Sequence, residues 1–370
     1  MLKIEPGVVV QFKSSQYTGI YDKPLFDFDF DNLEIGMLLI RGRLFAEGTT
    51  EDSILFTRSG NSGKWGILLF KDSENNILRN CIIEHSNYIS NFEDNNYMGA
   101  LSFHNSSANI TENSFRDNDY DGIESWASDD VIIKFNEFSR NRRGVYCKAG
   151  SCKIENNYFL HNSKGVHCYD HSSPEIIFNI FESVGIGVIC FNYSDPYISN
   201  CTFKCCSYGI YLERSNPDII GNLIINNTSD GIDCVDDSCN PKIINNTIVN
   251  NNFYGIGRSL RANPDIINNL FWGNGYSSIE FFENHTNPIV SYSLIPESNL
   301  PSESDGGNNI FAQNPLFVNP DTDDFQLLEN SPCINHGFVS SSLSLPALDI
   351  LGNNRISGSS IDIGCIEYQE

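Results

Sequence analysis

Residues 143–166 read RGVYCKAGSCKIENNYFLHNSKGV, and the pattern of this stretch recurs along the middle of the chain. A glycine followed by a small or branched apolar residue returns about every 22 residues. The pairs are Gly99-Ala100, Gly122-Ile123, Gly144-Val145, Gly165-Val166, Gly187-Val188, Gly209-Ile210, Gly231-Ile232 and Gly255-Ile256. Self-similarity at a period of this size indicates stacked supersecondary units.

Further columns keep the same register as the glycines. The first is an asparagine column of Asn113, Asn136, Asn157, Asn179, Asn222, Asn246 and Asn269, with Cys201 in the same slot. Two residues later stand Phe115, Phe138, Phe159, Phe181, Phe203, Ile224, Ile248 and Phe271. Three residues before the asparagine slot stand Ile110, Ile133, Ile154, Ile176, Ile198, Ile219, Ile243 and Ile266. Columns that agree in register exclude a chance repeat.

Each repeat contains three short apolar runs separated by turn-forming residues, with no room for a helix of about ten residues. We predict an all-β, single-stranded, right-handed parallel β-helix of about a dozen coils with three short strands per coil. The asparagines are predicted to lie at a turn and to hydrogen-bond the backbone, as scaffold rather than as ligands. We expect the β-helix over residues 1–295 and a C-terminal cap, packed on it, over residues 296–370.

The composition limits the partners of this chain. The formal net charge is −24, from 23 basic and 47 acidic residues, so a nucleic-acid backbone or an anionic membrane would be repelled. No apolar run reaches the length of a transmembrane helix. A predicted strand, Val8–Phe12, follows Met1 closely without a signal peptide, which leaves an earlier natural start open.

The twelve cysteines do not follow a disulfide or zinc pattern. Cys147, Cys168, Cys190 and Cys234 each lie three residues after a repeat glycine, a position that strand alternation points inward. Cys81 and Cys201 occupy the asparagine slot. We therefore expect mostly free thiols that pack as small core residues.

Both ends of the chain carry motifs of a known family. The opening contains Gly42-Arg43-Leu44-Phe45-Ala46-Glu47-Gly48-Thr49 and Trp65-Gly66-Ile67. This resembles the first coils of right-handed β-helix repeat proteins of the pectin-lyase-like superfamily. The end contains Asn314-Pro315-Leu316-Phe317, Ser331-Pro332-Cys333-Ile334-Asn335-His336-Gly337 and Ile361-Asp362-Ile363-Gly364-Cys365, which resembles the choice-of-anchor Q module. The resemblance implies a secreted or cell-surface protein linked to polysaccharide, and it carries over no catalytic residue.

Outward residues of the strand that follows each glycine are the candidate binding residues. Alternation sends the second and fourth positions after the glycine outward. The substrate-binding candidates are Phe103, Trp126, Lys148, Tyr169, Phe191 and Tyr211. Aromatic rings interleaved with charges suit sugar rings, which favours a glycan groove. The alternative is that the insertion at residues 84–98, or the C-terminal tail, covers this face and makes the rings a satellite core.

One constellation on this face suits β-elimination of a uronate. Tyr146 and His167 are one coil apart in the same column, so their Cα atoms lie roughly 5 Å apart. The reaction needs a base, an acid and positive charge on the carboxylate. His167 is the candidate base, Tyr146 an acid or base, and Arg143 and Lys164 the neutralising cations, with Glu124 nearby.

A second constellation is acidic and contains Glu213, Asp233, Asp236 and Asp237, with Asp230 beside them. Glu213 and Asp233 on adjacent coils suit the separation of carboxyl groups in inverting glycosidases. The same residues suit calcium, the only candidate cofactor, which needs several oxygen ligands. A solvated acidic edge is the remaining alternative.

The sequence therefore predicts an extracellular or surface β-helix protein that binds, and as a further option cleaves, polysaccharide. A lyase is favoured over a glycoside hydrolase if the protein is an enzyme. The alternative is a non-catalytic structural or adhesin-like rod. The expected partner is a polysaccharide or glycan, with no nucleic acid, no transmembrane segment and no prediction of oligomeric state.

Overall fold

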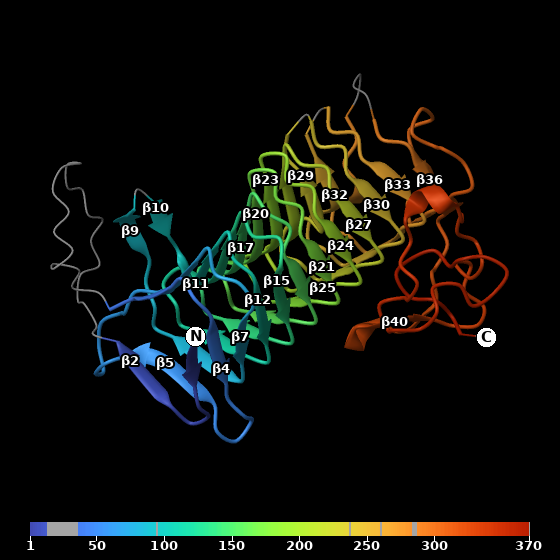
Figure 1. Cartoon of the computed structure of the whole chain (residues 1–370). Helices are drawn as coiled ribbons and strands as arrows, with labels where there is room; N and C mark the ends of the chain where they lie inside the picture. Colours follow the sequence, from blue (N-terminus) through green and yellow to red (C-terminus); the bar gives the residue numbers. More distant parts are fainter. Residues whose placement is uncertain (13–35, 94, 237, 260, 283–286, 370) are drawn as a thin grey trace. The chain divides into compact units, whose positions relative to one another are not determined.

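The computed structural model describes residues 1–12, 36–93, 95–236, 238–259, 261–282 and 287–369. The chain divides into two compact units, residues 1–167 and residues 168–370. In each unit short strands stack in parallel, coil upon coil (Figure 1). The described residues contain two 3-10 turns and no α-helix, and none of their helices is long and apolar enough to cross a membrane.

Three parallel sheets build the first unit, and we name them after the residue column that each carries. The isoleucine sheet contains β1 (Leu2–Ile4), β4 (Leu44–Glu47), β7 (Asn76–Arg79), β12 (Ala108–Thr111), β15 (Val131–Lys134) and β18 (Lys153–Glu155). The phenylalanine sheet contains β2 (Val9–Phe12), β5 (Ile54–Arg58), β8 (Cys81–Glu84), β13 (Ser114–Arg116), β16 (Glu137–Ser139) and β19 (Tyr158–Leu160). The glycine sheet contains β3 (Leu38–Ile40), β6 (Leu68–Lys71), β11 (Gly99–His104), β14 (Asp121–Trp126), β17 (Arg143–Lys148) and β20 (Lys164–Tyr169). The first unit ends at His167, within β20. An antiparallel hairpin, β9 (Ile89–Phe92) and β10 (Asn95–Tyr97), is inserted before β11.

The second unit repeats this arrangement, and its sheets carry the same names. Its isoleucine sheet contains β21 (Glu175–Ile177), β24 (Tyr197–Ser199), β27 (Asp218–Ile220), β30 (Lys242–Ile244), β33 (Asp265–Ile267) and β36 (Val290–Ser291). Its phenylalanine sheet contains β22 (Ile180–Glu182), β25 (Thr202–Lys204), β28 (Leu223–Ile225), β31 (Thr247–Val249), β34 (Leu270–Trp272), β37 (Leu294–Ile295) and β38 (Ile310–Phe311). Its glycine sheet contains β23 (Ile186–Phe191), β26 (Tyr208–Glu213), β29 (Ile232–Cys234), β32 (Tyr254–Arg258) and β35 (Ser277–Ile279). The predicted all-β parallel β-helix with three strands per coil is confirmed.

The interior of the coils is filled by stacked identical side chains. Phe138 stacks on Phe115 and on Phe159 with ring centroids 4.9 and 4.8 Å apart. The repeat glycines exist because these rings approach the glycine sheet closely. A Cβ atom on Gly144 would lie 2.5 Å from the Phe159 ring, which is far inside van der Waals contact. The phenylalanine column therefore fits inside the coils only because the facing column is glycine.

The asparagine column forms buried ladders of hydrogen bonds, as predicted. Asn136 donates to the carbonyl of Ile110 and to Oδ1 of Asn157, and its own Oδ1 accepts from the backbone and side-chain amides of Asn113. A second ladder, which the sequence reading did not single out, joins Asn118, Asn141 and Asn162 between the phenylalanine and glycine sheets. These bonds tie each turn to its neighbours in the adjacent coils.

The cysteines agree with the sequence prediction. No disulfide joins any of the twelve, and all except Cys205 are buried. Burial raises the pKa of the Cys81 and Cys201 thiols to about 12. These residues therefore act as small apolar core residues.

The C-terminal segment covers outward faces of the second unit. Its antiparallel pair, β39 (Phe317–Asn319) and β40 (Asp324–Leu327), packs with Ile363 and Cys365 against the outward residues Val249 and Leu270 of the phenylalanine sheet. The 3-10 turn η2 (Pro320–Thr322) lies between β39 and β40. The other 3-10 turn, η3 (Ser341–Leu343), packs its Leu343 against the isoleucine sheet.

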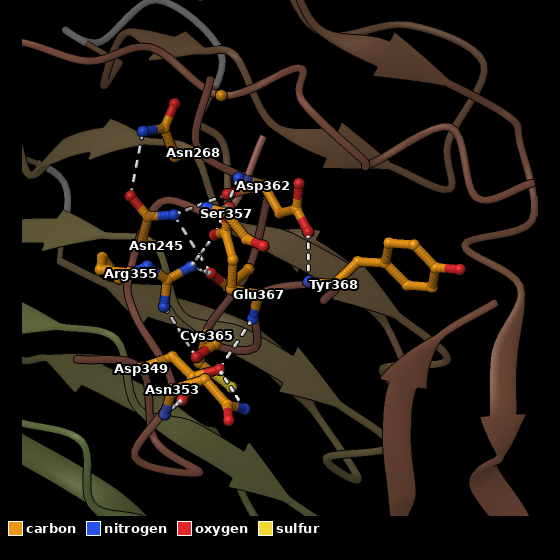
Figure 2. Close-up of polar contacts among 12 residues, drawn as sticks. Asn245, Asn268, Asp349, Asn353, Arg355, Ser357, Asp362, Cys365, Glu367 and Tyr368 are labelled. Carbon is orange, nitrogen blue, oxygen red and sulfur yellow. Dashed lines mark hydrogen bonds and ion pairs between the residues drawn. The ribbon is translucent and has the colours of Figure 1, made fainter. Parts of the chain in front are cut away.

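Polar contacts hold this segment in place (Figure 2). Asn245 donates to the carbonyls of Asp362 and Gly364, and Thr247 accepts from the Cys365 amide. Arg355 is almost completely buried and donates to the carbonyls of Gly364 and Cys365, both at 2.8 Å. The C-terminal segment therefore contacts the last coils of the second unit both through apolar side chains and through hydrogen bonds.

The asparagine ladder yields a direct stability prediction. Asn136→Ala should lower the free energy of unfolding by at least about 2 kcal/mol, because several buried polar groups lose their partners at about 1–3 kcal/mol each. Asn109→Ala is the matched control, since Asn109 is an exposed position of β12 in the same unit, and it should change stability by less than about 0.5 kcal/mol. Chemical denaturation measures both. Equal effects of the two substitutions would contradict the structural role of the ladder.

Candidate functional site

The glycine sheet of the first unit carries the candidate site, and its register decides which side chains face outward. β14 pairs with β17 so that Glu124 lies opposite Tyr146 and Trp126 opposite Lys148. This agrees with the alignment of glycines that the sequence predicts. The outward columns of these two strands are therefore as expected.

The placement of Phe103 was wrong. β11 pairs with β14 with Gly99 opposite Asp121 and Phe103 opposite Ser125, one residue away from the alignment of glycines. A one-residue slip turns every side chain of a strand to the other face. Phe103 consequently lies in the core, fully buried and stacked on Phe70 with centroids 4.4 Å apart. His104 lies beside Trp126 instead, in the place that the sequence assigned to Phe103.

The insertion at residues 84–98 covers part of this face. Ile89 and Tyr97 of the β9–β10 hairpin pack on Ile67 and Leu69, which are outward residues of the first coils of the glycine sheet. The covered-core alternative is therefore confirmed for these coils. Asp94, which belongs to the predicted insertion, lies outside the described residues.

Trp126 lies beyond the hairpin and is half-buried. The Lys148 ammonium is 4.0 Å from the centroid of its ring, and the His104 ring packs edge-on at 4.5 Å. Burial, followed by the positive charges of Lys71 and Lys148, lowers the pKa of His104 to about 4. A sugar stacked on Trp126 would meet a cation–π pair that the protein has already formed.

Arg143 is the centre of the predicted catalytic cluster. Its Nε and Nη2 donate to the two carboxylate oxygens of Asp121 at 2.6 and 2.8 Å. Its Nη1 lies 3.1 Å from Nδ1 of His167, and its Cζ lies 3.9 Å from the centroid of the Tyr146 ring. The Tyr146 and His167 rings are 5.1 Å apart. The structure thus brings Arg143, Tyr146 and His167 together, as the sequence reading expected.

Burial dominates the electrostatics of this cluster. His167 is only 7% exposed, and burial together with the charges of Arg143, Lys164 and Arg142 lowers its pKa to about 2. Burial raises the pKa of Asp121 to about 6, although Arg143 opposes the shift. Burial and the neighbouring arginines also lower the pKa of the half-buried Lys164. At neutral pH the imidazole is neutral and Asp121 is a carboxylate.

Glu124 connects the sheet to the insertion. Its Oε2 accepts hydrogen bonds from the Met98 amide at 2.8 Å and from the Ser102 hydroxyl at 2.9 Å. The side chain is almost completely buried, and burial, with the charge of Asp121, raises its pKa to about 7. Glu124 therefore anchors the chain that enters β11 next to the Arg143 cluster.

The second unit holds the remaining aromatic candidates. Tyr169, Phe191 and Tyr211 are all half-buried. The rings of Phe191 and Tyr211 meet edge to face at 6.0 Å, and Tyr208 lies 5.7 Å from Tyr211. Part of each ring is therefore accessible on the outward face of this unit.

The acidic constellation lies in the second unit, where Tyr211 is opposite Asp233, so Glu213 is two residues from Asp233 on the adjacent strand, as the sequence indicates. Asp233 has a pKa raised to about 7 by burial and by the charges of Asp230 and Glu280. Asp236 accepts hydrogen bonds from Ser238 and forms an ion pair with Arg214.

Glu213 lies opposite Phe191 in the sheet register, and Asp237 lies outside the described residues. In the part of the chain that the structure describes, no group of three or more His, Cys, Asp or Glu side chains is arranged to hold a metal ion. Calcium stays a prediction.

Several residues of the site were not selected from the sequence. Asp121 stands directly before a repeat glycine, in the same slot as Arg143 and Lys164 one and two coils later. Opposite charges in one slot of adjacent coils must meet, so this signal was readable. Met98 and Ser102 carry no such signal, because their contacts depend on the path of the insertion.

A known protein family matches the sequence of this chain. The family described as the right-handed β-helix region matches residues 58–195 and 179–295. These matches cover more than half of the chain, so this chain belongs to the right-handed β-helix family. No curated protein matches the sequence.

Three solved structures illustrate the likeness. A mutant of the periplasmic alginate epimerase AlgG is 14% identical and covers 70% of this chain and 70% of its own, with a TM-score of 0.56. Pectate lyase Pel9A is 16% identical over 98% of this chain and 88% of its own, with a TM-score of 0.41. Rhamnogalacturonan lyase is 11% identical over 92% and 88%, with a TM-score of 0.44. At 14% identity the likeness to the epimerase shows the β-helix fold and nothing finer.

The raised pKa of Glu124 leads to a pH prediction. Its pKa of about 7 in the folded protein lies above the value of about 4.3 in an unfolded chain. Its contribution to stability is complete below about pH 4.3 and is lost as the pH rises through 7. Between about pH 5 and about pH 8, the wild type should lose about 1–3 kcal/mol more stability than Glu124→Gln.

Chemical denaturation across this pH range measures the difference between the two proteins. Glu137→Gln, at an exposed position of β16, is the control and should follow the wild type. Parallel pH profiles of the wild type and Glu124→Gln would show that folding does not raise the pKa of the Glu124 carboxyl.

Proposed function

We propose that this protein binds a polysaccharide along the outward faces of its glycine sheets, and that any turnover proceeds by lyase-type β-elimination. The fold supports this proposal, because a solved structure of the same fold is that of an alginate epimerase. A polysaccharide also agrees with an outward face that, within each unit, repeats at each coil, about 4.8 Å apart.

The observation that carries the proposal is the pairing of accessible aromatic rings with charged groups in each unit. Trp126 and Lys148 form such a pair in the first unit, and Tyr211 lies next to Asp233 in the register of the second. Sugar rings offer C–H faces to aromatic rings and hydroxyls to charged groups. These pairs supply both kinds of contact.

The proposed chemistry uses the Arg143 cluster. In β-elimination the proton leaves C5 of the uronate, the C4–O4 bond breaks, a C4=C5 double bond forms, and O4 takes up a proton. We assign these proton transfers and hydrogen bonds to Tyr146 and His167. Arg143 already has a carboxylate partner in Asp121, so we assign neutralisation of the uronate carboxylate to Lys164.

The C-terminal segment and the location of the protein belong to the same proposal. We propose residues 296–370 as a cap of the choice-of-anchor Q type, on the motifs that resemble this module. The proposed location is extracellular or at the cell surface. Calcium is the proposed cofactor for the acidic side of the second unit.

A polysaccharide panel tests the function. The full chain is incubated with alginate, polygalacturonate, xylan and a neutral glucan, with and without calcium. Binding is measured by affinity electrophoresis and calorimetry, and turnover by the ultraviolet absorbance of unsaturated uronate products. We expect binding of at least one polymer. No binding to any of them would favour a structural or adhesin-like surface protein.

Aromatic variants locate the binding face. Trp126→Ala and Tyr211→Ala should each weaken polysaccharide binding about 10-fold, the effect of losing one ring stack. Tyr158→Ala is the control, because Tyr158 is a half-buried outward residue of the phenylalanine sheet, and it should bind like the wild type. If neither Trp126→Ala nor Tyr211→Ala weakens binding, the polymer does not lie on the glycine sheets.

A further inference from the structure

We propose that His171 and Tyr193 form an aromatic subsite for a pyranose ring, at the turns that follow β20 and β23 of the glycine sheet. The subsite rests on the proposed polysaccharide binding and extends it beyond the strands. His171 lies two residues after Tyr169, the last residue of β20. Tyr193 lies two residues after Phe191, the last residue of β23. We call His171 and Tyr193 the rim pair.

Both members of the rim pair are additions to a turn that other coils make with one residue fewer. A buried serine closes this turn, and serines of adjacent coils are hydrogen-bonded, with Ser172 N donating to Ser194 Oγ and Ser194 N to Ser215 Oγ. Two left-handed residues precede Ser172, and two precede Ser194. In other coils a single left-handed residue stands between the strand and the serine, namely Asp72, Asn105, Ala127 and Arg214. The turn itself therefore requires neither His171 nor Tyr193.

The backbone at Tyr193 is strained. Its φ is 60°, and φ at His171 is 63°. Asparagine, aspartate and histidine enter this left-handed region more readily than other side chains, whereas a bulky residue such as tyrosine is an outlier there. Strain of this kind clusters at binding and catalytic sites. The strain at Tyr193 therefore indicates a role outside the turn.

Burial of the rings does not offset this cost. Tyr193 is 55% exposed, and the His171 side chain is 70% exposed. The two rings stack on each other, with centroids 5.5 Å apart and planes inclined by 26°. Their backbone is held in place, because His171 N donates to Asn192 O at 3.0 Å and Tyr193 N donates to Arg214 O at 2.7 Å. The rim pair thus presents aromatic surface to solvent from a fixed position.

The chemistry of the rim pair suits a sugar. The C–H face of a pyranose packs on an aromatic ring, and its hydroxyls need hydrogen-bond acceptors nearby. Asp170 supplies an acceptor, because its partly exposed carboxylate has Oδ1 3.3 Å from Nδ1 of His171. Tyr169 and Phe191, two aromatic candidates of the proposed binding face, end the strands that lead into the rim pair. A polysaccharide on that face can therefore extend onto the rim pair.

Tyr193→Asn separates a binding role from a structural one. Asparagine enters the left-handed region more readily than tyrosine, so the substitution should raise the midpoint of chemical denaturation. Polysaccharide binding should weaken about 10-fold, the effect of losing one ring stack. Tyr193→Phe keeps the ring and should bind like the wild type. Lower stability of Tyr193→Asn together with unchanged binding would make Tyr193 a structural residue and overturn the proposal.

Phe135→Asn is the matched control for the relief of strain. Phe135 is 58% exposed and has a φ of 55°, but it lies between β15 and β16, at the turn that joins the isoleucine and phenylalanine sheets of the first unit. Phe135→Asn should raise the midpoint of denaturation as Tyr193→Asn does, and should leave polysaccharide binding unchanged. An equal loss of binding in both variants would assign the loss to a general effect of the substitution and overturn the subsite.

The binding measurements use the full chain with alginate, polygalacturonate, xylan and a neutral glucan. We expect Tyr193→Asn and Tyr211→Ala both to weaken binding of the polymer that the wild type binds. Weakened binding in Tyr211→Ala with unchanged binding in Tyr193→Asn would overturn the subsite and leave the proposed function intact. If the wild type binds none of the polymers, the proposed function and the subsite are overturned together.

Discussion

The hydrogen bonds of the buried asparagine ladders are the interaction on which the other features of each unit depend. Asn136 bonds to the backbone of the coil before it and to the side chain of the coil after it, so a coil cannot slide by one residue without breaking several buried bonds. A fixed register places equivalent side chains of adjacent coils directly against one another. The phenylalanine stack, the close approach of Phe159 to Gly144 and the Asp121–Arg143 pair all follow from that register.

The same register explains why the candidate site is electrostatically unusual for so acidic a protein. Asp121, Arg143 and Lys164 occupy one slot in successive coils, and the outward neighbours Tyr146 and His167 occupy another. Burial beneath neighbouring side chains strengthens each charge interaction. The result is a cluster in which a carboxylate, a guanidinium and a neutral imidazole are mutually oriented. The accessible groups, Trp126 and Lys148, lie at its side.

Much of this site could be predicted from the sequence, and the exceptions have physical causes. The alignment of the repeat glycines gives the correct strand positions of Trp126, Lys148, Tyr146, Arg143 and His167. The error at Phe103 arose because the insertion before β11 lets that strand enter the sheet one residue out of step with its glycine. A period of two makes such a slip reverse the face of every side chain. Contacts from Met98 and Ser102 to Glu124 depend on the path of the inserted hairpin, which no repeat constrains.

The sequence by itself determined the all-β parallel β-helix, the three strands of each coil, the asparagine ladder and the apolar character of the cysteines. It could do so because a repeat constrains every coil in the same way, and stacked identical residues leave few arrangements that bury them all. Only the tertiary structure decided which part of the outward face the β9–β10 hairpin covers, how the C-terminal segment closes over the second unit, and that Arg143 is held by Asp121. These features involve segments that occur once, and their positions are set by packing against the coils and not by the period.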